Sequence, residues 1–126
     1  MEDISKKIIE KLKLIEKNLP KFKDGRINYS NSNIALVLTC FIQVKNEILI
    51  LKRSDKVATY KGMWNTVASY IDDYVPLKEK VTEELNEEIS LNESQIEKFR
   101  IGKNYEFTDK KINKTWIVLS MSYNVI

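Results

Sequence analysis

The stretch PLKEKVTEELNEEISL, residues 76–91, decides the fold that we predict for this chain. Proline at its start and the absence of glycine inside it predict one helix. Leu77, Val81, Leu85 and Ile89 recur every four residues and form an apolar stripe, which must face a core. The rest of the chain is easiest to understand as the support of this helix.

Several glutamates of this helix lie where apolar side chains are expected. At about 100° per residue, Glu84 and Glu88 fall within the arc of the apolar stripe, and Glu87 falls on its edge. A solvated face would place its charges opposite the stripe. Carboxylates three and four residues apart also repel each other by roughly 0.2–0.5 kcal/mol per pair. We expect Lys80 to pair with Glu83 or Glu84, which relieves only part of the repulsion.

Three clustered carboxylates are the kind of site that a hard divalent cation occupies. Mg²⁺ and Mn²⁺ prefer oxygen ligands, and a bound cation would remove the repulsion between the glutamates. The alternative is an acidic helix that is simply exposed to solvent. The helix alone does not decide between these two interpretations.

Composition indicates a single globular domain of 126 residues, 43% of them hydrophobic. A balance of 21 basic and 18 acidic residues, without an arginine cluster, does not indicate a nucleic-acid partner. The absence of histidine excludes His-based triads and the usual zinc sites. A single cysteine, Cys40, favours a cytoplasmic protein without disulfides. No membrane partner is expected, because no apolar run approaches the ~18 residues of a membrane span.

The N-terminal part of the chain, residues 1–20, predicts an amphipathic helix over residues 3–19 that Pro20 ends. Its apolar side consists of Ile4, Ile8, Leu12, Ile15 and Leu19. Such a helix can cover a sheet face or a dimer partner. The loop that follows leads to the main domain, which we place at residues 33–126.

Strands are predicted on both sides of the acidic helix. Residues 34–44, IALVLTCFIQV, form a nearly continuous apolar run that is typical of a strand buried on both faces, and residues 47–52 alternate as its hairpin partner. The remaining predicted strands are residues 63–71, 99–107 and 115–125. This order predicts an α+β fold, an α/β/α sandwich with a mixed β-sheet plus the N-terminal amphipathic helix.

This succession of strand, loop and acidic helix resembles the Nudix hydrolase superfamily. The signature of that family is G-x5-E-x7-R-E-U-x-E-E-x-G-U, where U is a bulky aliphatic residue. Laid on this chain without gaps, it spans residues 69–91, and Glu84, Glu87 and Glu88 match the acids of the R-E-U-x-E-E core. Further matches are Leu85, Leu91, Asp72, the lead-in Gly62-Met63-Trp64 and Arg53 after the second predicted strand.

Four signature positions carry other residues: Ser69, Val75, Glu83 and Ser90. The arginine that Glu83 replaces normally orients the acids by charge-assisted hydrogen bonds, so an attraction becomes a repulsion. Without glycine at positions 69 and 90, the loop must turn differently or bear strain in the left-handed region. A fold tolerates such changes more readily than catalysis does.

The chain is also shorter after its last strand than the resemblance implies. Nudix domains usually continue into a further strand and a closing helix. We therefore expect the N-terminal helix, or a second subunit of a homodimer, to cover what that closing helix would cover.

The resemblance implies a hydrolase that cleaves a pyrophosphate bond in a nucleoside diphosphate derivative with the help of Mg²⁺ or Mn²⁺. It assigns both catalysis and metal binding to Glu84, Glu87 and Glu88, with a main-chain carbonyl near Ala68 or Ser69 as a further ligand. Which group acts as the general base stays open. Candidates for an additional ligand or base are Glu106 and Asp109.

Substrate contacts follow from residue chemistry. Arg53, Lys56 and Lys61 could meet phosphates, and Tyr60, Trp64 or Tyr70 could stack on a base. Each of them fits a structural role equally well, and Trp64 and Trp116 fit a core better than a site. No motif identifies the substrate. Two alternatives stay open beside the hydrolase: a Nudix-fold nucleotide-binding or regulatory module without turnover, and an unrelated α+β domain with an acidic surface helix.

Overall fold

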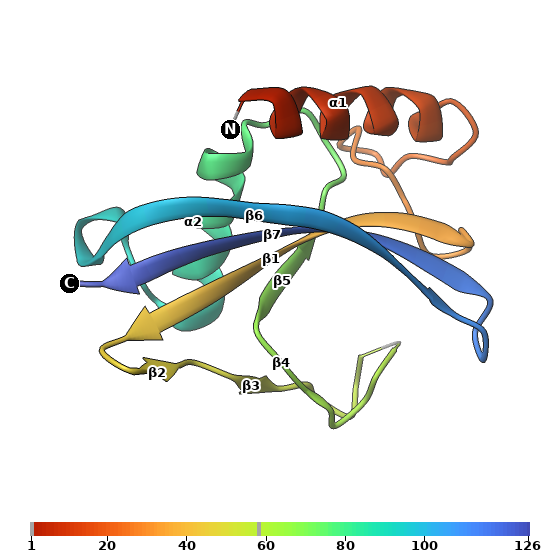
Figure 1. Ribbon diagram of the computed structural model, residues 1–126. Coiled ribbons are helices and arrows are strands. Elements are labelled where there is room, and N and C mark those ends of the chain that lie inside the picture. Colours follow the sequence, from red (N-terminus) through yellow and green to blue (C-terminus); the bar gives the residue numbers. More distant parts are fainter. Residues whose placement is uncertain (1, 58) are drawn as a thin grey trace.

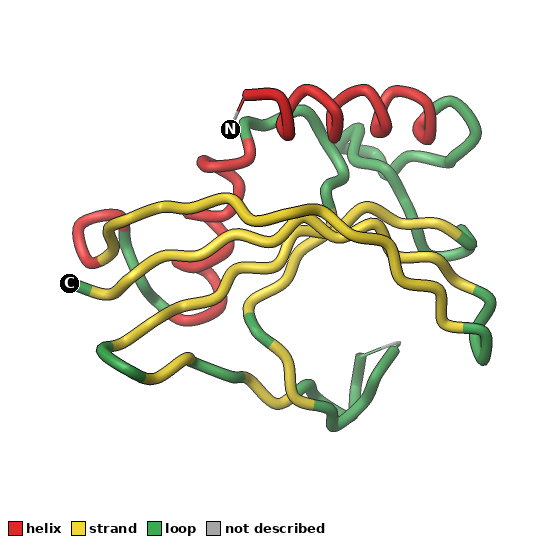
Figure 2. The backbone as a smooth tube through the Cα atoms, viewed as in Figure 1, coloured by secondary structure: helices red, strands yellow, loops and turns green. Residues whose placement is uncertain are grey.

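The computed structural model describes residues 2–57 and 59–126, and within them it contains two α-helices and seven strands (Figures 1 and 2). Met1 and Ala58 lie outside the described residues. The side chains of residues 2–5 are not described either, so the predicted role of Ile4 in the apolar stripe lies outside them as well.

A mixed five-stranded sheet is built around β1 (Ile34–Val44), which has the predicted bounds. It pairs antiparallel with β2 (Glu47–Ile48) and β5 (Val67–Tyr70), and parallel with β7 (Lys114–Val125). β6 (Ile96–Asp109) completes the sheet antiparallel to β7. The predicted α+β class with a mixed sheet is confirmed.

Two predicted strands are each divided in the structure. Residues 47–52 split into β2 and β3 (Leu51–Lys52), and residues 63–71 split into β4 (Trp64–Asn65) and β5. β3 and β4 pair with each other in a separate two-stranded sheet, which Figure 2 shows apart from the main sheet. The second division falls at Thr66, whose hydroxyl donates to the Cys40 carbonyl. This bond ties the residue between β4 and β5 to the central strand β1.

One face of the sheet carries the main core. Leu36, Leu38, Cys40 and Ile42 alternate along β1 and are at most 1% exposed. α2 (Leu77–Ile89) packs beside β5 and lies behind the sheet in Figure 1. Its predicted stripe is confirmed, because Leu77, Val81 and Leu85 are buried and Ile89 packs against the core.

The N-terminal helix is part of the same core. α1 (Glu2–Glu16) ends before the predicted Leu19 and lies above β6 in Figure 1. Ile8 and Leu12 are each 1% exposed, and the Lys11 ammonium lies 3.3 Å from a carboxylate oxygen of Glu106 on β6. The expectation that this helix covers part of the sheet is therefore confirmed. No helix in the described part of the chain has the length and apolarity needed to cross a membrane.

Candidate functional site

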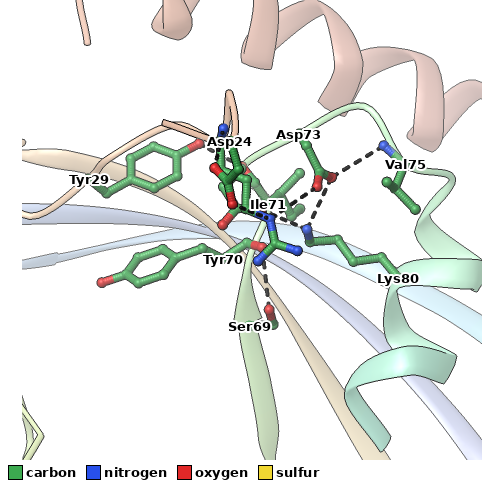
Figure 3. A network of polar contacts seen from close by, with 10 residues as sticks. Asp24, Tyr29, Ser69, Tyr70, Ile71, Asp73, Val75 and Lys80 are labelled. Carbon is green, nitrogen blue, oxygen red and sulfur yellow. Dashed lines mark hydrogen bonds and ion pairs between the residues drawn. The ribbon is translucent and has the colours of Figure 1, made fainter. Parts of the chain in front are cut away.

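The first turn of α2 is fixed by a buried lysine. The Lys80 ammonium lies 2.7 Å from Asp72 Oδ1 and 3.1 Å from Asp73 Oδ1, and the side chain is 9% exposed (Figure 3). Burial alone would lower the pKa of Lys80, but its hydrogen bonds to the two aspartates raise it. The predicted pairing of Lys80 with Glu83 or Glu84 is wrong, because the chain entering from β5 brings two aspartates under the first turn.

The glutamates of the second half of α2 have no such partner. Glu84 is half-buried, whereas Glu83, Glu87 and Glu88 are exposed. Burial and the neighbouring Glu88 carboxylate together raise the pKa of Glu84 from 4.5 to about 7, while a hydrogen bond with Ser69 acts in the opposite direction. These glutamates take part in none of the ion pairs formed between described residues.

The structure brings together two of the three predicted metal ligands. Glu84 and Glu88 are neighbours on the side of α2 that faces Ser69 of β5, whereas Glu87 is exposed on the edge of this pair. Among the side chains that the structure describes, those of residues 6–57 and 59–126, no group of three acidic or cysteine side chains converges closely enough to hold a metal ion. The available donors are carboxylate oxygens, which suit a hard cation.

A cavity of about 620 Å³ lies against β5, and its lining includes Ser69 but neither Glu84 nor Glu88. Ala68, Ser69 and Tyr70 line it from β5, and Arg53 lines it from the loop that follows β3. Three predicted site residues thus share one cavity. Trp64 does not line it: this side chain is 63% exposed on β4, so it neither joins the cavity nor belongs to the core.

Sequence reasoning missed most of the aromatic wall of this cavity. Tyr105 and Phe107 on β6 and Trp116 on β7 line it, and the register pairs Phe107 with Trp116 and Tyr105 with Val118. The alternation of Tyr105 and Phe107 along the predicted strand was the available signal, because alternate residues of a strand share one face. Only the pairing register shows that this face also holds Trp116.

The loop after β3 closes the cavity by defined hydrogen bonds. Arg53 Nε donates to the Thr59 carbonyl at 3.1 Å. The Tyr60 hydroxyl donates to Asp109 Oδ2 at 2.9 Å and accepts from Trp116 Nε1 at 3.0 Å. Asp109 therefore holds the Tyr60 hydroxyl in place, and through it the Trp116 side chain in the aromatic wall of the cavity. Of the other predicted candidates, Glu106 lines the cavity, whereas the exposed Lys56 and Lys61 do not.

No protein-family model matches the chain, and no curated protein matches it either. Solved structures do match. A MutT protein from Methanosarcina mazei Go1 superposes with a TM-score of 0.62 at 21% identity, over 76% of this chain and 67% of that one. A NUDIX hydrolase from Nitrosomonas europaea gives 0.60 at 13% identity, over 73% and 59%. The chain has the Nudix fold.

The likeness extends to a C. elegans Ap4A hydrolase, with a TM-score of 0.50 and 12% identity over 73% of this chain and 68% of that one. Identities of this size demonstrate a shared fold and leave activity to be argued from the site. The chain also spans only 59% of the N. europaea protein.

Two departures from the Nudix signature have a visible structural outcome. Ser90, in place of a glycine, ends α2 in the left-handed region with φ 57° and ψ 29°. This is the strained alternative that the sequence predicted. Ser69, in place of the other glycine, lies in the extended strand β5 and carries no such strain.

Proposed function

We propose that this protein is a divalent-metal-dependent hydrolase of the Nudix type, which cleaves a pyrophosphate bond in a nucleoside diphosphate derivative. One observation carries the proposal: on a Nudix fold, the Glu84 and Glu88 carboxylates lie close to each other and to Ser69, a residue that also lines a cavity with aromatic walls. Close carboxylates without a cation are unfavourable, and a metal ion would stabilise them.

The residues present fit Mg²⁺ or Mn²⁺. Glu84, Glu87 and Glu88 would hold the ion together with the main-chain carbonyl of Ala68, a set of oxygen donors that suits both metals. The raised pKa of Glu84 shows that this position disfavours an isolated negative charge. When bound, the ion would supply charge neutralisation at the pyrophosphate and a lowered pKa for an attacking water.

The protein's own side chains would then bind and orient the substrate. Arg53 is half-buried in the cavity and pairs with no carboxylate in the described part of the chain, so its guanidinium is available to a phosphate. Tyr70 and Trp116 offer aromatic surface for a base. A glutamate of α2 that is not occupied by metal would accept the proton of the attacking water.

The test is product release from a panel of nucleoside diphosphate derivatives with Mg²⁺, with Mn²⁺ and with a chelator. We expect metal-dependent turnover that Glu88→Gln lowers by at least about 100-fold. The matched control is Glu79→Gln, the same change at an exposed position one helical turn before Glu83, which should leave turnover unchanged. Turnover that persists in chelator, or in Glu88→Gln, would contradict the proposal.

A second candidate, a nucleotide-binding module without turnover, is favoured by one observation. No three acidic side chains converge within the described residues, and Glu83 stands where the signature has arginine. This candidate predicts that calorimetry detects Mn²⁺ and nucleoside diphosphate binding while the whole panel stays intact. Binding lost in Glu84→Gln would then assign it to the same site.

A further inference from the structure

Tyr29 connects the chain segment before the sheet to both parts of the candidate site. It lies in the loop between α1 and β1 and is 2% exposed. Its hydroxyl donates to the Ile71 carbonyl at 2.6 Å, and its ring stacks on that of Tyr70 with the centroids 5.2 Å apart (Figure 3). The Tyr29 carbonyl accepts a hydrogen bond from Lys114 Nζ at 3.2 Å. A single buried residue thus holds three elements.

The hydroxyl contact acts on the connection between β5 and α2. This connection joins β5, which carries Ser69, to α2, which carries Glu84. Its position therefore sets the distance and orientation between Ser69 and Glu84. The same loop contributes two more contacts to it: Ile27 N donates to the Asp72 carbonyl at 2.8 Å, and Arg26 Nε lies 3.8 Å from Asp73 Oδ2. Residues 26–29 therefore hold the connection from outside the helix, while Lys80 holds it from within.

The ring contact acts on the aromatic wall of the cavity. Tyr70, stacked on Tyr29, in turn stacks on Trp116 with the centroids 6.3 Å apart and the planes at 26°. Lys114 closes this arrangement, because its ammonium lies 4.8 Å from the centre of the Trp116 ring. Lys114 is 8% exposed and pairs with no carboxylate among the described residues, so the Tyr29 carbonyl and the indole face are its stabilising contacts.

We propose that Tyr29 is a positioning residue of the candidate site. Its hydroxyl sets the acidic helix relative to β5, and its ring sets the wall formed by Tyr70 and Trp116. This inference rests on the proposed function, because it assigns metal binding to the helix and substrate binding to the wall. If Tyr29 only filled the core, its replacement would affect metal binding and substrate binding together or not at all. Its hydroxyl and its ring contact different parts of the site, so the two effects can be separated.

The experiment compares Tyr29→Phe with Tyr29→Leu in the full chain. Phenylalanine keeps the stacked ring and loses the hydroxyl, so we expect the Mn²⁺ concentration for half-saturation, followed by electron paramagnetic resonance, to rise about fivefold, the factor that one hydrogen bond contributes. The KM of the nucleotide substrate should not change. Leucine removes the ring as well, and it should raise both the Mn²⁺ half-saturation and the KM.

Ile8→Val is the control variant for a loss of stability without a change in the candidate site. Ile8 is 1% exposed on α1, and its truncation should lower the melting temperature without altering Mn²⁺ half-saturation or KM. Amide hydrogen exchange of residues 71–80 provides a readout that needs neither metal nor turnover. Exchange there should accelerate in both Tyr29 variants and stay unchanged in Ile8→Val.

The outcomes distinguish this inference from the proposed function. Unchanged exchange and unchanged Mn²⁺ half-saturation in Tyr29→Phe would overturn the positioning role even if the wild-type protein is an active hydrolase. A wild-type protein without Mn²⁺ binding or turnover would overturn the proposed function and the role of Tyr29 in metal binding. In that case, faster exchange in the variants would still support its hold on the connection.

Discussion

The two halves of α2 differ in how the carboxylates near them are neutralised. In the first half, the buried Lys80 lies within 3.1 Å of both Asp72 and Asp73, so each of these carboxylates has a cation beside it. In the second half, Glu84 lies beside Glu88 with no cation from the described residues, and the pKa of Glu84 rises to about 7. The carboxylates at the start of the helix have a protein cation beside them, whereas those near its end have none among the described residues.

This difference indicates what each half contributes. A charge that is already balanced holds the helix in place and needs no ligand. Neighbouring carboxylates that are not balanced cost stability in the isolated protein, and the cost is recovered when a cation binds. The helix therefore combines an anchor in its first turns with a candidate metal site in its last turns. Four predictions test this contrast.

The largest effect is expected from breaking the balanced half. Lys80→Met removes the buried ammonium and leaves Asp72 without a cation and Asp73 with only Arg26, which should lower the free energy of unfolding by about 3 kcal/mol, as measured by urea denaturation. The control is Lys78→Met on the exposed side of the same helix, where a change within about 0.5 kcal/mol is expected. Equal losses in the two variants would show that the first half is not an anchor.

The next effect concerns the unbalanced half. Mn²⁺ at 100 times its dissociation constant should raise the free energy of unfolding by about 2.7 kcal/mol through binding to the folded state. Thermal denaturation with and without Mn²⁺ measures this, and Glu84→Gln should abolish most of the gain. If millimolar Mn²⁺ left the melting temperature of the wild-type protein unchanged, the last turns of α2 would be an ordinary acidic surface.

A smaller effect is expected from pH in the presence of chelator. The pKa of Glu84 is raised from 4.5 to about 7 in the folded protein, so the folded state holds this proton more tightly than the unfolded state. The contribution of Glu84 to stability should therefore be full below pH 4.5, fall as pH rises to about 7 and then level off. The loss should be about 1–2 kcal/mol, because the carboxyl is only half-buried. Urea denaturation across this range should show no such fall in Glu84→Gln, and the exposed Glu83→Gln should retain it.

The smallest effect concerns the end of the helix. Ser90 adopts a left-handed conformation that favours glycine, so Ser90→Gly should stabilise the protein by about 0.5–1 kcal/mol and raise the melting temperature by a few degrees. Ser90→Ala keeps a Cβ atom at this position and serves as the control without gain. Calorimetry that finds the two variants equally stable would show that Ser90 is not strained.

Much of the fold could be predicted because periodicity reports burial directly. The strand of residues 34–44 has the predicted bounds, and α2 begins and ends within two residues of its prediction. The division of residues 63–71 at Thr66 was missed, because the Thr66 hydroxyl bonds to the carbonyl of Cys40, which lies 26 residues away in the sequence. For the candidate site, Arg53, Ala68 and Tyr70 line one cavity and Trp64 lies outside it, while the roles assigned to them stay predictions.

The sequence by itself determined the acidic helix, its apolar stripe and the neighbouring positions of Glu84 and Glu88, since helical periodicity depends only on spacing along the chain. Only the tertiary structure decided which charges meet. Lys80 pairs with Asp72 and Asp73. Tyr29 stacks on Tyr70 and donates a hydrogen bond to Ile71, residues that lie more than forty positions away in the sequence. Such partners are set by strand register and chain packing, and no local pattern in the sequence records them.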